Sequence, residues 1–104
     1  MKGLNEMKLV VYQSLRAKWR GKDWEYAKSN QFSLNSYNAV YEEDYEVPRE
    51  IQDKPTECLS HIYQLITWAK PINYWGDNLD YGDIIEVDGI KYYIDHLGLH
   101  KCEE

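Results

Sequence analysis

The clearest structural signal in the sequence is the run Asp83-Ile84-Ile85-Glu86-Val87-Asp88-Gly89-Ile90-Lys91-Tyr92-Tyr93-Ile94. An Asp-Gly pair between two β-rich runs predicts a type I′ hairpin, because both central residues of that turn need positive φ. A two-residue loop pairs Ile85 with Tyr92 and Glu86 with Lys91. Side chains alternate along each strand, so Glu86 and Lys91 form an opposite-charge pair on one face. The other face should turn toward the core and carries Ile85, Val87, Ile90, Tyr92 and Ile94.

Elements upstream of this hairpin are predicted from periodicity. Residues 8–12 and the alternating stretch 37–45 are typical of strands, and Asp23 can cap a short helix over about 23–29. Pro55 favours the first turn of a main helix over about 55–66, with Thr56 or Asp53 as a capping residue. Its expected buried stripe is Leu59, Ile62, Tyr63 and Ile66. The fold class is therefore α+β, a small, mostly antiparallel sheet of three to five strands packed against one main helix.

Length and composition indicate a single domain over residues 1–104. The chain is 43% hydrophobic, which is enough for one core. No apolar run approaches about 18 residues and no secretory leader follows Met1 or the alternative start Met7, so we expect a cytoplasmic protein without a membrane segment. Cys58 and Cys102 are too few for a disulfide framework and fit a reducing compartment.

The charge is unevenly distributed along the chain. Residues 1–30 hold seven Lys or Arg and three acids, whereas residues 31–104 hold five and fifteen, for a net charge of −6. The acids around 42–50 and 77–88 either form a solvated surface or present carboxylates to a basic groove on a partner protein. Uncompensated carboxylates repel phosphate, which disfavours direct nucleic-acid binding there. The segment Arg16–Lys22, with Trp19, is the alternative nucleic-acid contact.

The aromatic residues are ten Tyr and four Trp against one Phe. Tyr and Trp are amphipathic and suit interfaces, although they also cover core edges. Core packing should use Tyr12, Tyr41, Tyr63 and Tyr92, while the interface candidates are Tyr37, Tyr45, Tyr74, Trp75, Tyr81 and Tyr93. A long loop over about 70–82 offers Ile72, Tyr74, Trp75 and Leu79 as anchors. With the acids, the predicted partner-binding set is Glu42, Glu43, Asp44, Tyr45, Tyr74, Trp75, Asp77, Asp80, Tyr81 and Asp83.

Several segments together carry a family resemblance over residues 8–99. They are Leu9-Val10-Val11-Tyr12-Gln13, Val40-Tyr41-Glu42, the main helix, residues 76–85 and Tyr92-Tyr93-Ile94-Asp95-His96-Leu97-Gly98-Leu99. This pattern resembles the YodL-like domain family. The resemblance implies a small accessory protein of Gram-positive phages or mobile elements, associated with antirestriction, and no transferable catalytic activity. We therefore expect a non-enzymatic module that binds and modulates a host protein, such as a restriction or CRISPR nuclease.

Two other groups of residues have side chains that suit a metal or catalytic site. Cys58-x-x-His61 and His100-x-Cys102 have ligand types that suit zinc, although a helical Cys is more often a core residue. Asp77, Asp80 and Asp83 recur every third residue and, if they converged with His96, could support a small metal-dependent enzyme. The competing interpretation is that Asp80 or Asp83 accepts backbone N–H groups in a turn. We predict no metal, no cofactor and no catalytic residue.

Overall fold

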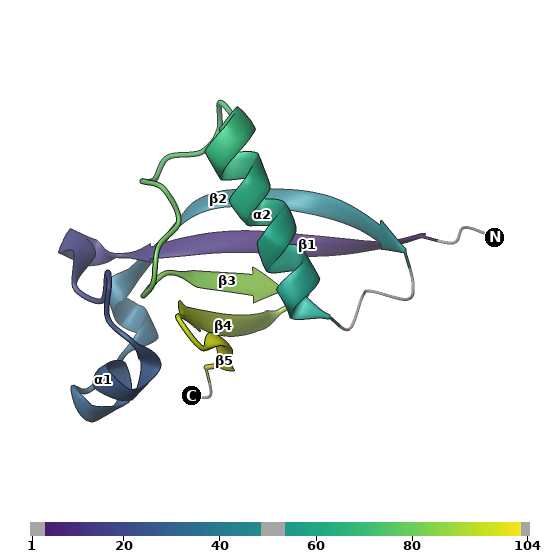
Figure 1. The fold of residues 1–104 in the computed structure, drawn as a ribbon. Helices are drawn as coiled ribbons and strands as arrows, with labels where there is room; N and C mark the ends of the chain where they lie inside the picture. The colour runs from purple at the N-terminus through teal and green to yellow at the C-terminus, as the bar shows by residue number, and fades with distance from the viewer. Residues whose placement is uncertain (1–3, 49–53, 103–104) are drawn as a thin grey trace.

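The computed structural model describes the backbone of residues 4–48 and 54–102, and the side chains of residues 8–44, 54 and 56–102. Its centre is a five-stranded antiparallel sheet in the order β2-β1-β3-β4-β5 (Figure 1). The strands are β1 (Leu4–Ser14), β2 (Tyr37–Pro48), β3 (Ile84–Val87), β4 (Ile90–Asp95) and β5 (Gly98–Lys101). The helices are α1 (Trp24–Ser29) and α2 (Pro55–Ala69), with 3-10 turns at η1 (Leu15–Ala17) and η2 (Leu34–Ser36). The predicted α+β class is confirmed.

The predicted hairpin forms β3 and β4 in the predicted register. Ile85 pairs with Tyr92 and Glu86 with Lys91, whose charged atoms lie 3.3 Å apart. Asp88 and Gly89 both have positive φ, at 52° and 89°, as the turn requires. On the predicted core face, Ile85, Val87 and Ile94 are buried and Tyr92 is partly buried, but Ile90 at the hairpin end is 39% exposed.

The sheet has a core on each face. On the α2 face, Leu9, Val11 and Ile85 pack with Ile62 and other aliphatic residues. On the opposite face, residues 15–36 fold back over the sheet, so Trp19 and Ala27 pack with Tyr37, Ile84 and Tyr93. The prediction of Tyr37 and Tyr93 as interface residues is therefore wrong, because this aromatic cluster needs them in its centre.

The two helices follow the predicted capping and periodicity with three differences. Asp23 caps α1, since its Oδ1 accepts the Tyr26 N–H at 2.8 Å. In α2, Ile62 and Ile66 are buried and Leu59 is partly buried, but Tyr63 is 54% exposed and Cys58 fills the stripe instead. The helix continues to Ala69 and its N-cap is Lys54. Thr56 lies inside the helix, no described side chain caps its start, and Asp53 lies outside the described residues. None of the described helices is long and apolar enough to cross a membrane.

Candidate functional site

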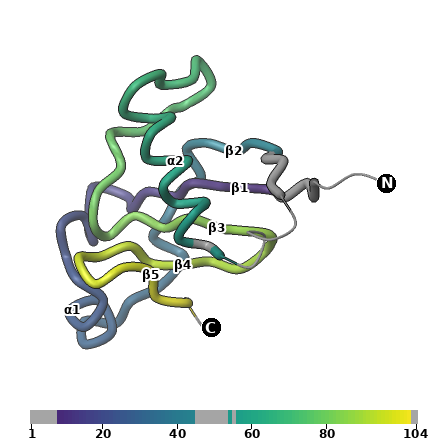
Figure 2. Tube along the Cα trace, turned by 45° about the vertical axis from the view of Figure 1, so that its right-hand side comes forward, coloured from purple at the N-terminus to yellow at the C-terminus, as the bar shows by residue number. Residues whose placement is uncertain are grey.

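Residues 70–83, here called the docked loop, run from the C-terminal end of α2 to the start of β3, beside the segment that follows β1 (Figures 1 and 2). Gln13, at the end of β1, fixes the loop. Its Nε2 donates to the Asp77 carbonyl at 2.9 Å, and its Oε1 accepts the Asp77 N–H at 2.9 Å. The predicted anchors Tyr74 and Leu79 pack against the core, whereas Ile72 and Trp75 are exposed.

Asp83 is the buried carboxylate of the docked loop. Its Oδ2 accepts the Asp80 N–H at 2.8 Å and a Gln13 amide hydrogen at 3.2 Å, and its Oδ1 lies 3.6 Å from Arg20 Nη1. Burial raises the pKa of Asp83 to about 6, although the Asp80 N–H and Arg20 oppose the shift. Asp80 accepts the Tyr81 N–H at 2.7 Å. The turn interpretation of these acids is confirmed, and Asp83, with no exposed surface, cannot be a partner contact.

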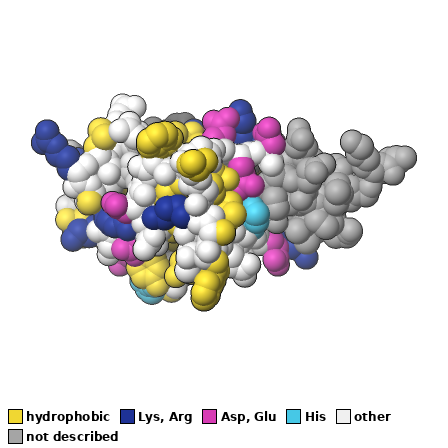
Figure 3. Space-filling view, turned by 90° about the horizontal axis from the view of Figure 1, so that it is seen from above, with side chains coloured by type: hydrophobic (Ala, Val, Ile, Leu, Met, Phe, Trp, Pro, Cys, Tyr) yellow, Lys and Arg dark blue, Asp and Glu magenta, His cyan; other side chains and the backbone are white. Residues whose placement is uncertain are grey.

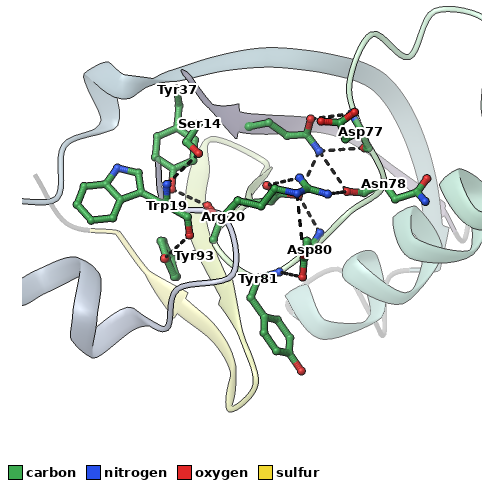
Figure 4. Close-up of polar contacts among 12 residues, drawn as sticks. Ser14, Trp19, Arg20, Tyr37, Asp77, Asn78, Asp80, Tyr81 and Tyr93 are labelled. Carbon is green, nitrogen blue, oxygen red and sulfur yellow. Dashed lines mark hydrogen bonds and ion pairs between the residues drawn. The ribbon is translucent and has the colours of Figure 1, made fainter. Parts of the chain in front are cut away.

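The basic segment after β1 lies against the docked loop. Arg20 Nη2 donates to the Asn78 carbonyl at 2.5 Å (Figure 4). The Gly21 N–H donates to the Tyr81 carbonyl at 2.6 Å. The Trp19 ring, proposed for nucleic-acid stacking, is only 2% exposed and its Nε1 donates to Ser36. The segment thus supports the loop with Trp19 and Arg20, and leaves Arg16, Lys18 and Lys22 on the surface.

A hollow of about 440 Å³ lies between α2 and the docked loop, on the β4 side of the helix. We call it the tyrosine groove, and its lining is Leu59, Tyr63, Leu79, Asp80, Tyr81, Ile94 and Asp95. Tyr63 and Tyr81 are about half exposed. The Asp80 side chain is 48% exposed, so the groove combines apolar residues, two phenol rings and an accessible carboxylate.

The second carboxylate of the tyrosine groove, that of Asp95, is engaged within the fold. It accepts hydrogen bonds from the Trp24 N–H at 2.8 Å and the Leu97 N–H at 2.9 Å. Its Oδ1 also lies 2.8 Å from His100 Nε2. Burial alone would raise the pKa of Asp95, but the hydrogen bonds from Trp24, His100 and Leu97 together outweigh it and lower the pKa. Asp80 is therefore the carboxylate of this groove that a ligand could contact.

The ten predicted partner-binding residues do not form one surface. Asp80 and Tyr81 lie in the tyrosine groove, and Trp75 and Asp77 are exposed elsewhere on the docked loop. Tyr74 is only 7% exposed and its hydroxyl donates to the Asp77 carbonyl, so its prediction as a surface contact is wrong. The Tyr45 side chain lies outside the described residues.

The acids of β2 are divided by the strand geometry. Successive side chains point to opposite faces, so Glu42 pairs with Lys8 at 2.7 Å on one face and Glu43 with His61 of α2 at 3.1 Å on the other. Asp44 follows Glu42 by two residues, so its side chain points to the same face of the sheet as that of Glu42. Figure 3 accordingly shows acidic side chains in separate groups, with hydrophobic side chains between them.

The candidate zinc ligands are also separated. Cys58 is buried in the core on the α2 face, whereas Cys102 packs against the aromatic cluster on the other face. His61 contacts Glu43, and His100 contacts Asp95. His96 lies beside Tyr81, with ring centroids 6.3 Å apart. Within the part of the chain that the structure describes, no three His, Cys, Asp or Glu residues are arranged to hold a metal ion.

Sequence reasoning did not identify the residues that shape the two flanks of α2. Leu59 and Tyr63 line the tyrosine groove on one flank. Trp68, 84% exposed, lies on the other beside a second hollow of about 300 Å³ lined by His61, Gln64, Leu65 and Trp68. The sequence did contain a signal for the exposure of Trp68, since this residue falls outside the stripe of Leu59, Ile62 and Ile66.

No family model, curated protein or solved structure matches the chain.

Proposed function

We propose that this protein is a non-enzymatic protein-binding module whose tyrosine groove holds a segment of a partner protein. The observation that carries the proposal is the composition of the groove. Concave, mostly apolar hollows with a few polar groups are the usual form of binding sites, and partly exposed Tyr residues are common binding hot spots. Tyr63 and Tyr81 stand at this hollow with about half of each side chain still available for contact.

The groove favours a partner segment that carries an apolar side chain next to a basic one. Leu59, Leu79 and Ile94 offer the apolar surface, and the exposed carboxylate of Asp80 offers a charged hydrogen-bond acceptor. Arg20 Nε is 3.8 Å from Asp80, a distance that leaves this carboxylate able to accept a further donor. The net charge of −6 would steer basic partners toward the protein and raise the rate of association.

The finer proposal is that the partner is a host protein in the bacterial cytoplasm. The resemblance to YodL-like domains supports a phage or mobile-element accessory protein that modulates such a host factor. A nuclease or another nucleic-acid-handling protein fits the required chemistry, because its nucleic-acid groove carries basic residues.

Affinity capture from a Gram-positive lysate with the wild type and two matched variants tests this proposal. Tyr63→Ala removes a groove side chain that is 54% exposed, and Tyr26→Ala removes a comparably exposed Tyr, at 44%, from α1. We expect a captured protein that Tyr63→Ala reduces at least about tenfold, in line with loss of a hot-spot aromatic. Tyr26→Ala should retain it.

Two results would overturn the proposal. The first is a captured protein that Tyr63→Ala retains as well as Tyr26→Ala does. The second is a salt-sensitive shift of labelled nucleic acid by the purified protein, lost when Lys18 and Lys22 are replaced by Ala, which would assign the function to the basic segment instead.

A further inference from the structure

We infer that the Trp68 flank of α2 is a self-association surface, through which two copies of this chain pair their α2 helices antiparallel. This surface lies on the opposite flank of α2 from the tyrosine groove and shares none of its residues. The inference is therefore independent of the proposed function.

The first observation is an exposed side chain next to a hollow on the same helix. The hollow of about 300 Å³ is lined by His61, Gln64, Leu65 and Trp68. The Trp68 side chain remains 84% exposed, so it projects from the surface beside the hollow. A large apolar side chain in this position loses contact with water only when another molecule covers it.

The second observation is that these four positions are symmetric along the helix. A midpoint between Gln64 and Leu65 lies equally far from His61 and Trp68, so a two-fold axis there places Trp68 of one copy opposite His61 of the other. Each Trp68 side chain can then fill the hollow of the other copy, so each copy contributes one inserted side chain and one hollow. Self-complementarity of this kind is what an isologous dimer requires.

The third observation concerns charge. Each copy carries a net charge of −6, so two copies repel one another over most of their surfaces. Residues 58–69 contain no Asp, Glu, Lys or Arg, and Glu43, which reaches this flank from β2, is paired with His61. Glu57, one turn before His61, is exposed at the N-terminal end of the flank. The flank is therefore neutral over residues 58–69, where a second copy can approach without direct repulsion.

Two further large apolar side chains are exposed in the docked loop that follows α2. Ile72 is 99% exposed and Trp75 is 83% exposed, and the Trp75 N–H donates to the Val40 carbonyl of β2, on the side where His61 contacts Glu43. An aromatic side chain buries about 150–250 Å². Trp68, Ile72 and Trp75 from both copies would bury about 1,000 Å² in total, the lower limit for a specific interface. We expect a weak dimer, with a Kd on the order of 10 µM.

Sedimentation velocity of the full chain from about 1 µM to about 500 µM tests the inference. The wild type should pass from monomer to dimer across this range, and Trp68→Ala should raise the Kd at least about tenfold. Leu97→Ala is the matched control, because Leu97 is 74% exposed on the β4–β5 turn, and it should dimerise like the wild type.

Crosslinking tests the register. In a Cys102→Ser background, where the remaining Cys58 is buried, Gln64→Cys should give a covalent dimer with a short bis-maleimide. Packed helix axes are about 8–10 Å apart, and the two residues 64 would be nearly level along them. Ser60→Cys, on the same helix, should not crosslink, because its two copies would lie about 12 Å further apart along the axes than the two residues 64.

Four results would overturn the inference. They are a wild type that stays monomeric at the highest concentration, a dimer Kd that Trp68→Ala leaves unchanged, crosslinking of Ser60→Cys as efficient as that of Gln64→Cys, and a monomer that binds zwitterionic lipid vesicles in a Trp68-dependent way. The last result would assign the flank to a membrane surface. Circular dichroism of Trp68→Ala checks that the fold is retained.

Discussion

The two acidic segments, residues 42–44 on β2 and residues 77–83 in the docked loop, each contain three acids but have different surroundings. Glu42 and Asp44 remain exposed and Glu43 contacts a helix side chain. In the docked loop, Asp83 has no exposed surface and organises the loop around Gln13 and Arg20. The number of acids in a segment therefore does not by itself show that their side chains are exposed. The difference arises because a strand alternates its side chains, whereas a turn directs carboxylates toward its own N–H groups.

The largest effect should come from Gly82→Ala, which would break the close contact between the docked loop and the segment after β1. Gly82 has a φ of 92°, and an added Cβ would overlap the Trp19 carbonyl group. We expect a loss of at least about 4 kcal/mol in the free energy of unfolding, or failure to fold. Urea denaturation measures it. Gly21→Ala is the control, because it also has positive φ but an open environment, and should lose only about 1 kcal/mol.

The pH dependence of stability should separate the buried acid from the exposed ones. The pKa of Asp83 is about 6 in the folded protein and 3.8 as its ordinary value. Its contribution to stability is therefore fully present below about pH 4 and is lost as the pH rises through 6, by up to about 3 kcal/mol. In the Asp83→Asn variant, the free energy of unfolding, measured by urea denaturation, should depend less on pH between pH 4 and 7. A slope unchanged by this variant would contradict the assignment.

Replacing Asp83 by Ala should destabilise the protein far more than the same change at Asp44. Asp83→Ala leaves the Asp80 N–H and an amide hydrogen of Gln13 without their acceptor, at a cost of about 2 kcal/mol. Asp44 is exposed, so Asp44→Ala should not measurably change the urea midpoint. Equal effects at the two positions would mean that the two segments do not differ as described.

The smallest effects should distinguish the acids within β2. Glu43→Gln weakens a partly buried contact with His61, and we expect a loss of about 0.5 kcal/mol. Glu42→Gln removes an ion pair with Lys8 in which both side chains are more than half exposed, and should produce no measurable change. Thermal unfolding at low salt and at about 1 M salt compares them. A larger loss for Glu42→Gln would reverse this order.

The sequence predicted the parts of the fold that depend on local rules. The pairing of Ile85 with Tyr92 follows from the Asp-Gly turn, and the cap at Asp23 follows from side-chain chemistry. The aromatic core on the second face was not predicted, because it requires residues 15–36 to fold back over strands that are distant in sequence. The role of Gln13 was missed for the same reason, since its partner Asp83 is 70 residues away.

The candidate site was predicted less well. Two residues of the predicted partner-binding set, Asp80 and Tyr81, line the same groove, but that groove also needs Leu59 and Tyr63 from α2. Periodicity assigned Tyr63 to the core, because it shares the helical spacing of Ile62 and Ile66. At a helix flank a one-position difference in spacing separates a buried side chain from a half-exposed one, and a single sequence does not resolve it.

The position of β2 at the margin of the sheet gives its acids a further consequence. An outermost strand with free N–H and C=O groups is a template for pairing with strands of other molecules, which leads to aggregation. If β2 strands of two molecules paired edge to edge, the carboxylates at 42–44 of one molecule would lie close to those of the other. Their repulsion opposes this pairing. The docked loop already occupies the margin at Val40, through the Trp75 N–H. The acids therefore protect the part of this margin next to that contact, and keep the protein dispersed in a crowded solution.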